Sequence, residues 1–168
     1  VLSTIRFFAA GRAVSQPRVS DGKGNDHKIM APAGHAIRGW RNQVKAAAQR
    51  AMGAQRPLVG SIVLEVEFVF RRPQRLCVER TDPLKEGEFY IDQRVDHTSD
   101  PDWDNIGKAV SDALKMVVWV DDCFVSRAIV DKRYADRDET PGVWVTVSQR
   151  CAACKVHHGR CLTCGAAR

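Results

Sequence analysis

The segment from residue 100 to residue 122, DPDWDNIGKAVSDALKMVVWVDD, constrains the fold more than any other part of the chain. Acidic residues stand at both of its ends, and between them lie an apolar stripe with helical spacing and a short apolar run. The spacing predicts an amphipathic helix that packs on a core. Its apolar stripe comprises Ile106, Ala109, Val110, Ala113 and Leu114.

The first acidic pair stands just before this helix. Asp102 and Asp104 alternate with Trp103 and follow a proline, so we expect an extended lead-in from which both carboxylates point to the same side. Either Asp104 or Asn105 would then cap the helix by accepting hydrogen bonds from its free N–H groups.

The second acidic pair, Asp121 and Asp122, follows the apolar run 116–120, which is short and β-branched and therefore predicts a buried strand. If helix and strand fold back on each other, both acidic pairs meet at one end. Such a concentration of carboxylates is costly unless a divalent cation lies among them, and hard cations prefer carboxylate oxygens. Lys108, four residues after Asp104, would project beside it. The segment therefore predicts a metal site.

Each part of this pattern also has a simpler interpretation. An acidic turn that caps a helix is common, and sugar-nucleotide transferases and phosphatases also carry Asp-x-Asp. Lys108 alone would be an exposed helix lysine paired with Asp104 or Asp112. The combination of two acidic pairs with a helix that bears a lysine favours metal catalysis. His97, in the preceding loop, fits a loop residue and a site residue equally well.

Charge is distributed unevenly along the 168 residues, whose net charge is +6. Residues 1–56 carry 10 basic and 2 acidic residues, residues 57–149 carry 12 and 18, and residues 150–168 carry 4 and none. An acidic centre between basic ends suits a polyanion held by the ends while metal ions neutralise the middle. A basic protein without such a partner is an equal alternative.

The rest of the sequence predicts a mixed-sheet α/β or α+β domain with two main helices. Apolar alternation predicts a half-buried strand over 62–70, and the polar segment 73–99 is long for a connection. The other expected elements are strands over 4–10, 124–134 and 143–148, a helix over 36–52, and a loop over 11–34.

The last residues form a separate Cys-rich tail, 150–168, after a domain that spans 1–149. Two CxxC pairs lie six residues apart, and such pairs converge on Zn²⁺ in structural sites. The spacer is shorter than usual, and disulfides are the alternative, although they are rare in cytosolic proteins. The predicted zinc ligands are Cys151, Cys154, Cys161 and Cys164.

The sequence contains no apolar run near the roughly 18 residues of a membrane span. Its first residues lack the charged, apolar and small-residue order of a signal peptide. We therefore expect a cytoplasmic protein, in a bacterial cell or encoded by a phage, with no membrane contact.

The acidic segment resembles the signature of the RusA family of Holliday junction resolvases, found in bacteria and phages. The shared pattern is an aspartate, one residue, Asp-Asn, a helix lysine, Asp-Ala-Leu and a later Asp-Asp. His97 and Lys132 are also similar to many members. Here the pattern reads Asp102, Asp104-Asn105, Lys108, Asp112-Ala113-Leu114 and Asp121-Asp122, within a resemblance over about residues 4–149.

This resemblance implies a homodimeric endonuclease that depends on Mg²⁺, with Mn²⁺ as an alternative ion, and cuts four-way DNA junctions symmetrically. It assigns the essential carboxylates to Asp102, Asp104 and Asp122, and the essential lysine to Lys108. In the metal site that we expect, Asp121 is a second metal ligand or a residue that orients the ligands from outside. The Cys-rich tail is not part of the family pattern.

Basic residues outside this signature are candidates for salt-dependent DNA contact. They are Arg12, Arg18, Lys28, Arg71, Arg72 and Lys132. A different hypothesis is a non-catalytic DNA-binding accessory protein that uses its basic ends and zinc tail. A sugar-nucleotide transferase is disfavoured, because the sequence has no glycine-rich turn between a strand and a helix.

Overall fold

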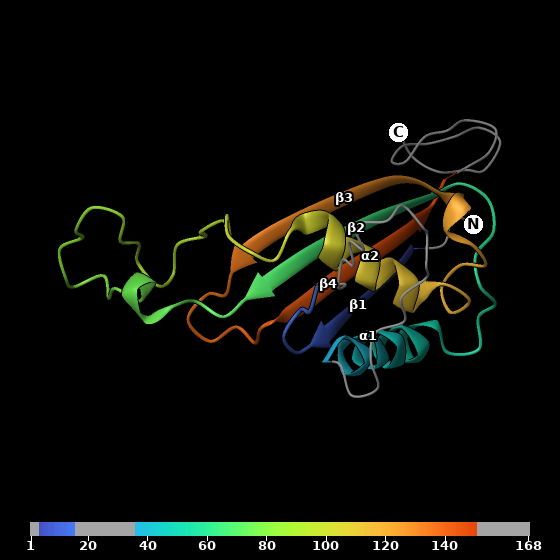
Figure 1. Ribbon diagram of the computed structural model, residues 1–168, viewed down its shortest axis with the longest axis horizontal. Coiled ribbons are helices and arrows are strands. Elements are labelled where there is room, and N and C mark those ends of the chain that lie inside the picture. Colours follow the sequence, from blue (N-terminus) through green and yellow to red (C-terminus); the bar gives the residue numbers. More distant parts are fainter. Residues whose placement is uncertain (1–3, 16–35, 151–168) are drawn as a thin grey trace, which may run out of the picture.

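Four strands make up the central sheet: β1 (Thr4–Ala10), β2 (Ile62–Phe70), β3 (Val125–Tyr134) and β4 (Gly142–Gln149), in the spatial order β1-β4-β2-β3 (Figure 1). The computed structural model describes residues 4–15 and 36–150. Its helices are α1 (Ala36–Met52) and α2 (Trp103–Leu114), and two 3-10 turns cover Gln74–Leu76 and Asp122–Phe124. The predicted mixed sheet with two main helices is confirmed.

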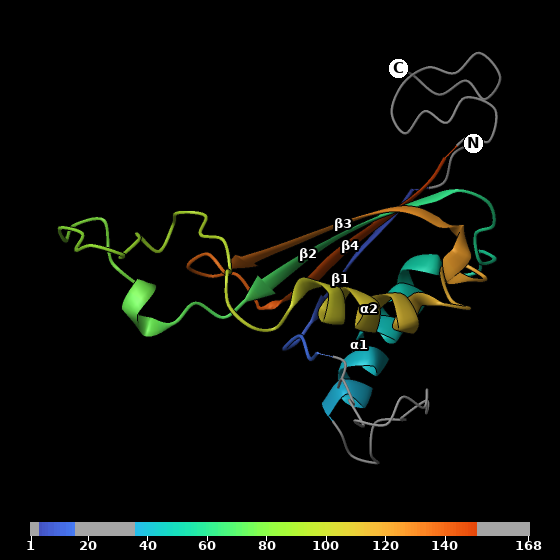
Figure 2. The ribbon, with the colours of Figure 1, turned by 45° about the horizontal axis from the view of Figure 1, so that its top comes forward.

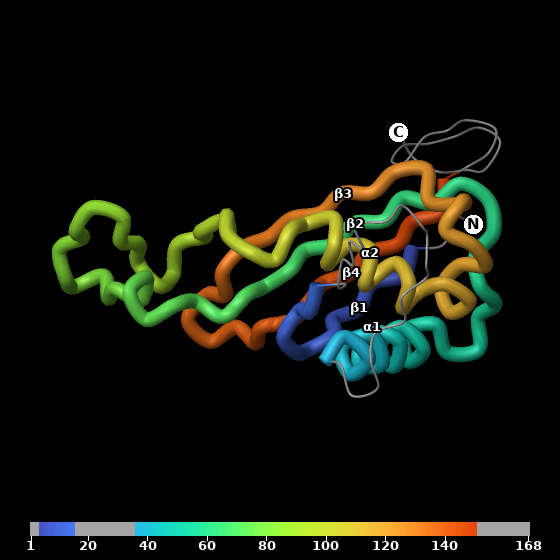
Figure 3. The backbone as a smooth tube through the Cα atoms, viewed as in Figure 1, coloured from blue at the N-terminus to red at the C-terminus, as the bar shows by residue number. Residues whose placement is uncertain are grey.

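The sheet has one parallel pair, and this pair determines the path of the chain. β4 pairs with β1 and β2 in antiparallel orientation, whereas β2 and β3 are parallel. A parallel pair needs a crossover connection. Here the crossover consists of an extended loop, residues 71–100, followed by α2, as the tube in Figure 3 shows.

Both helices lie on one face of the sheet (Figure 2). The whole predicted apolar stripe of α2 is buried there, together with Val44 and Trp40 of α1. Gly107 faces β3, where a Cβ would make an ordinary van der Waals contact of 3.5 Å with Cγ2 of Val130. This packing fixes the position of α2, and with it the acidic residues at the two ends of the helix.

The extended loop reaches far beyond the sheet (Figure 1) and is attached to it by a buried arginine. The Arg72 guanidinium donates to the carbonyl oxygens of Ala135, Tyr90 and Gln93 at 3.0, 2.8 and 2.5 Å. These bonds join three segments: the start of the loop just after β2, its returning part before α2, and the residue that follows β3.

The returning end of the loop also pairs with β3. The Tyr134 N–H donates to the Val95 carbonyl at 2.8 Å, and the His97 N–H donates to the Lys132 carbonyl at 3.0 Å. The chain therefore leaves β2 and comes back beside the neighbouring strand before it enters α2.

The run 116–120 is not a strand, which corrects one prediction. Met116 has a left-handed backbone with φ of 64°, and its N–H donates to the Trp119 carbonyl at 2.7 Å. The run thus forms a tight turn at the end of α2, joined to Leu58 by the Leu58 N–H to Val118 carbonyl bond of 2.8 Å. Its apolar character is explained by burial, since Val118 and Trp119 are fully buried.

No helix within residues 4–15 and 36–150 is long and apolar enough to cross a membrane. The Cys-rich tail, with its four predicted zinc ligands, lies outside the described residues.

Candidate active site

The first acidic pair lies at the N-terminal end of α2. The helix begins at Trp103, so its N-cap is Asp102 and not Asp104 or Asn105 as predicted, and Asp104 lies in the first turn. Their expected strand-like alternation is therefore wrong. Both residues are exposed, and a negative charge here interacts favourably with the positive end of the helix dipole. Two accessible carboxylates thus stand at one end of a buried helix.

Lys108 is exposed one turn further along α2, and its Nζ lies 3.9 Å from Oδ1 of Asp112. Asp112 is also bound across the helix pair by Arg41 of α1, at 2.5 Å. The interaction with Asp112 agrees with the simpler interpretation of Lys108. The side chain is still 63% exposed, so it remains accessible to a phosphate near Asp104.

The second acidic pair lies at the other end of α2, where Asp122 accepts two hydrogen bonds. Its Oδ1 receives the indole N–H of Trp119 at 2.8 Å and the hydroxyl of Ser111 at 3.1 Å. Trp119 is fully buried, so its indole N–H needs this acceptor. Asp122 therefore has a structural role in holding the turn after α2 against the helix.

Asp121 belongs to a separate, exposed pair. Lys115 lies 2.6 Å from its Oδ2, and the Cys123 N–H donates to its Oδ1 at 3.0 Å. The hydrogen bond from Lys115, followed by that from Cys123, lowers the pKa of Asp121 to about 2. The carboxylate of Asp121 is thus ionised over the whole physiological range.

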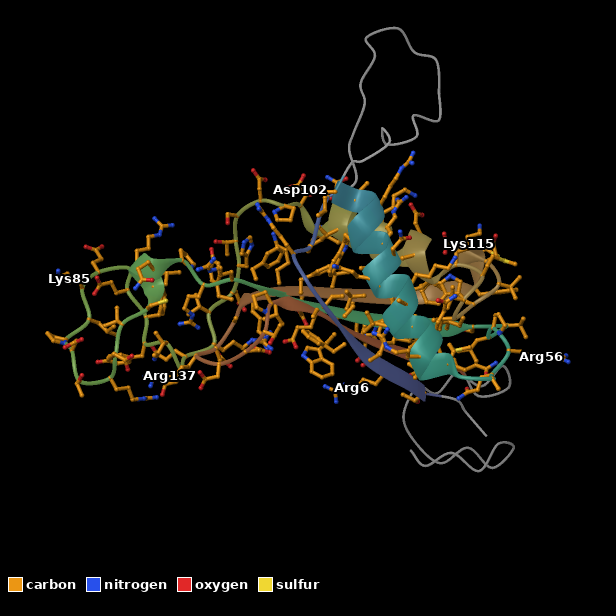
Figure 4. The ribbon with its side chains drawn as sticks, turned by 90° about the horizontal axis from the view of Figure 1, so that it is seen from below. Arg6, Arg56, Lys85, Asp102, Lys115 and Arg137 are labelled. Carbon is orange, nitrogen blue, oxygen red and sulfur yellow. The ribbon has the colours of Figure 1, made fainter. Side chains whose placement is uncertain are left out.

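The two acidic pairs do not meet within one chain, which corrects the geometry expected from the sequence. The first pair lies at the start of α2, whereas Asp122 is bound to Ser111 near its other end, about 10 Å along the helix axis from Asp104. Figure 4 labels Asp102 and Lys115 at these opposite ends. Across the part of the chain that the structure describes, no three His, Cys, Asp or Glu side chains are grouped as a metal site. The turn at 116–120 keeps the second pair beside Ser111.

Lys132 holds the segment that leads into α2. Its ammonium donates to the carbonyl oxygens of Ser99 and Pro101 at 2.8 and 2.9 Å. Pro101 immediately precedes Asp102, so Lys132 fixes the backbone from which that carboxylate projects. These two bonds give Lys132, predicted to contact DNA, a positioning role.

His97 is buried beside this segment, with 7% of its surface exposed. Its ring stacks on Phe70 with the centroids 4.0 Å apart and lies against Tyr134 at 4.8 Å. Burial, and then the positive charge of Lys132, lower the pKa of His97 below its usual value. The imidazole is therefore neutral at pH 7.

The other predicted DNA contacts differ in their accessibility. Arg12 and Arg71 are exposed, as a DNA contact requires. The prediction for Arg72 is wrong, because its guanidinium is only 5% exposed and is used by backbone carbonyls. Arg18 and Lys28 lie outside the described residues.

Sequence reasoning missed the residues that act through hydrogen bonds. Ser111 and Trp119, which hold Asp122, were not singled out. Lys132 was predicted to contact DNA, and its hydrogen bond to the lead-in to Asp102 was not foreseen. The only sequence signal for the contacts with Asp122 is a serine on the polar side of the predicted helix, followed by a tryptophan before an acidic pair.

The fold and the accessible carboxylates define a small α+β domain with an acidic site at the start of its crossover helix. Residues 11–148 match the family model of endodeoxyribonuclease RusA. The chain therefore belongs to the RusA family, whose members act on branched DNA and resolve Holliday junctions, and it is an endonuclease. No curated protein matches the chain.

Proposed function

We propose that this endonuclease hydrolyses four-way junctions symmetrically, as a homodimer that depends on Mg²⁺. The observation that carries the proposal is the exposed carboxylate pair, Asp102 and Asp104, on a helix that is fixed by a buried apolar stripe. The family match supplies the substrate class, branched DNA.

The donor set at the start of α2 fits Mg²⁺. This ion is usually held by one or two carboxylates, with waters and substrate phosphates completing its shell. Asp102 and Asp104 would supply the carboxylates, and Mn²⁺ would be the alternative ion. When bound, the cation would lower the pKa of a water and stabilise the charge that develops on the scissile phosphate.

The side chains around this pair have separate roles in the proposal. Asp102 and Asp104 would hold the cation beside the phosphate to be cut. Lys108, on the same face one turn later, offsets the negative charge that develops on the phosphate. Lys132 keeps Pro101, and therefore Asp102, in place by its hydrogen bond to the Pro101 carbonyl.

The distance between the two acidic pairs supports a dimer. If Asp122 also serves as a metal ligand, a second chain would supply it to the site at Asp102, because within one chain Asp122 is bound to Ser111, about 10 Å along α2 from Asp104. Two copies with antiparallel α2 helices would place the second pair of one chain beside the first pair of the other. Trp103 and Met116 are exposed by 62% and 67% at the two ends of α2, and burying them would favour such pairing.

The test is cleavage of a labelled four-way junction, compared with linear duplex, in Mg²⁺ and in EDTA. Wild-type protein should produce paired symmetric nicks in the junction only, and none in EDTA. Asp104→Asn should abolish cutting while junction binding persists. Asp131→Asn, which changes an exposed carboxylate on β3, is the matched control and should cut normally.

Two results would contradict the proposal. Binding without cutting in all divalent ions would favour a non-catalytic accessory protein and would direct attention to the predicted zinc tail. Loss of junction binding in Asp104→Asn would give that carboxylate a structural role. Sedimentation of the protein with and without a junction would test the dimer.

A further inference from the structure

A cavity of about 840 Å³ lies beside the lead-in to α2, and its lining includes Asp100 but neither Asp102 nor Asp104. It opens between the end of β1, the end of β2 and the segment before Asp102. Its size falls within the range of about 300–1,000 Å³ that is typical of ligand pockets. Most of its wall is apolar, contributed by Ala13, Val14, Val69, Phe70, Pro101 and Pro141.

His97 gives this cavity a polar group that lacks a partner. The residue is more than nine-tenths buried and lines the cavity, yet its Nδ1 has no hydrogen-bond partner among the described residues. Its Nε2 lies 3.5 Å from the Ser99 hydroxyl, at the limit of a hydrogen bond. A buried polar atom is normally paired, so an unpaired one on a cavity wall points to a ligand atom that would pair with it.

The charges around the cavity limit the chemistry of this ligand. The imidazole is neutral and the wall apolar, so the inner part of the ligand is uncharged, flat-sided and able to hydrogen-bond. Arg12, Arg71 and Asp100 line the cavity and are exposed, so its rim carries two guanidinium groups and one carboxylate. The two guanidinium groups stand where they can reach phosphates outside the cavity. A nucleobase inside with its backbone phosphates outside satisfies both conditions.

We propose that this cavity holds an unstacked nucleotide base next to the scissile phosphate. This inference rests on the proposed function for its location, because Pro101 lines the cavity and directly precedes Asp102. Base pairs near a branch point are the easiest to open, and extruding a base costs least where pairing is already weak. The base would lie along the apolar wall beside Phe70 and bond to Nδ1 of His97, and this contact would influence where the junction is cut.

The experiment measures binding of five-nucleotide single strands to the full chain in EDTA, one strand for each base and one made of abasic residues. At least one base should bind about 5 to 100 times more tightly than the abasic strand, because base stacking contributes that much per nucleotide. The imidazole signals of His97 should shift in the same titration. Equal affinity for natural and abasic strands overturns the proposal, whatever the cleavage assay shows.

Variants separate recognition of the base from phosphate contact. His97→Phe keeps an aromatic ring between Phe70 and Tyr134 but removes both nitrogens, so the preference among bases should fall while the abasic strand binds as before. Val14→Trp, at a partly buried position on the wall, should exclude the base if His97→Phe does not fold. Unchanged base preference in the folded variants overturns the proposal.

Two further variants test contact with the phosphates. Arg71→Gln should weaken natural and abasic strands equally. Arg127→Gln, an exposed cation near the start of β3, is the matched control and should change neither. If base-dependent binding is found but junctions are not cut, the cavity is established and the proposed function fails. If junctions are cut but binding does not depend on the base, the proposed function stands and the proposal for the cavity fails.

Discussion

The two ends of α2 carry similar acidic pairs in very different surroundings. At the start of the helix, Asp102 and Asp104 are exposed and lie next to a cavity. At its end, Asp122 accepts bonds from a buried indole and a serine, and Asp121 is paired with Lys115. Similar sequence motifs thus stand in different surroundings: the first pair is exposed beside a cavity, whereas in the second pair Asp122 holds the turn after α2.

The largest effect is the loss of cleavage expected when a carboxylate at the start of the helix is removed. Asp102→Asn should lower junction cleavage by at least about 100-fold, because an electrostatic or metal contact to the transition state contributes several kcal/mol. The thermal midpoint of the protein should fall only slightly, since the carboxylate is exposed and asparagine is also a favoured N-cap residue, so that only the interaction with the helix dipole is lost. Single-turnover cleavage together with a melting curve provides the test, and a variant that cuts normally would exclude Asp102 from the site.

The next effect concerns stability at the end of the helix. Asp122→Ala should reduce the free energy of unfolding by about 1–3 kcal/mol, because it leaves the buried indole N–H of Trp119 without an acceptor. Asp122→Asn keeps an oxygen acceptor and should lose much less. Urea unfolding measures both.

Cleavage by the Asp122→Asn variant then tests whether the acidic pair at the end of α2 takes part in the reaction. A stable variant that no longer cuts would make this carboxylate a metal ligand as well as a structural acceptor. A stable variant that cuts normally would restrict the catalytic carboxylates to the start of α2. In the first case, mixing Asp122→Asn with Asp102→Asn protein should restore part of the activity if the site is shared between two chains.

A smaller effect is expected on the titration of His97. Burial and the charge of Lys132 lower its pKa, so Lys132→Met should raise that pKa toward the usual value of about 6.5. In the wild type, the unfolded chain binds a proton at a higher pH than the folded one. Stability should therefore fall as the pH drops below about 6.5, down to the lowered pKa.

NMR titration of the imidazole measures this shift directly, and unfolding at several pH values checks its sign. A His97 pKa that stays the same in Lys132→Met would mean that burial alone determines it. Lys132→Met should also slow cleavage, because the segment before Asp102 loses two hydrogen bonds.

The smallest effect is expected at Asp121. Lys115→Met should raise the pKa of Asp121 from about 2 toward its usual value of 3.8. The unfolding free energy should hardly change, because exposed ion pairs contribute little. A large loss of stability would show that this pair holds the turn after α2.

Periodicity predicted the fold well, because burial is repeated along each element. Every residue of the apolar stripe in α2 is buried, and four strands and two helices lie where alternation and spacing placed them. The run 116–120 was misinterpreted because a buried turn and a buried strand have the same apolar composition, and the left-handed backbone at Met116 leaves no periodic signal.

The candidate site was predicted only in part, because its contacts are formed between distant segments. The motif located Asp102 and Asp104 correctly on the surface. It gave no information on whether the second acidic pair returns to them, since this depends on the direction of the chain after α2. Arg72 was misjudged for the same reason, because only the folded loop reveals the carbonyl groups around it.

The extended loop is a part of the chain that can change in length during evolution without disturbing the sheet. Its two ends lie side by side, because the Ala135 N–H donates to the Phe70 carbonyl at 2.7 Å and the Tyr134 N–H donates to the Val95 carbonyl. A segment that leaves and re-enters a domain at adjacent points can change in length without altering the path of the rest of the chain. Lineages could therefore lengthen, shorten or replace this loop, and so acquire new partners, while the sheet and the helix α2 stay the same.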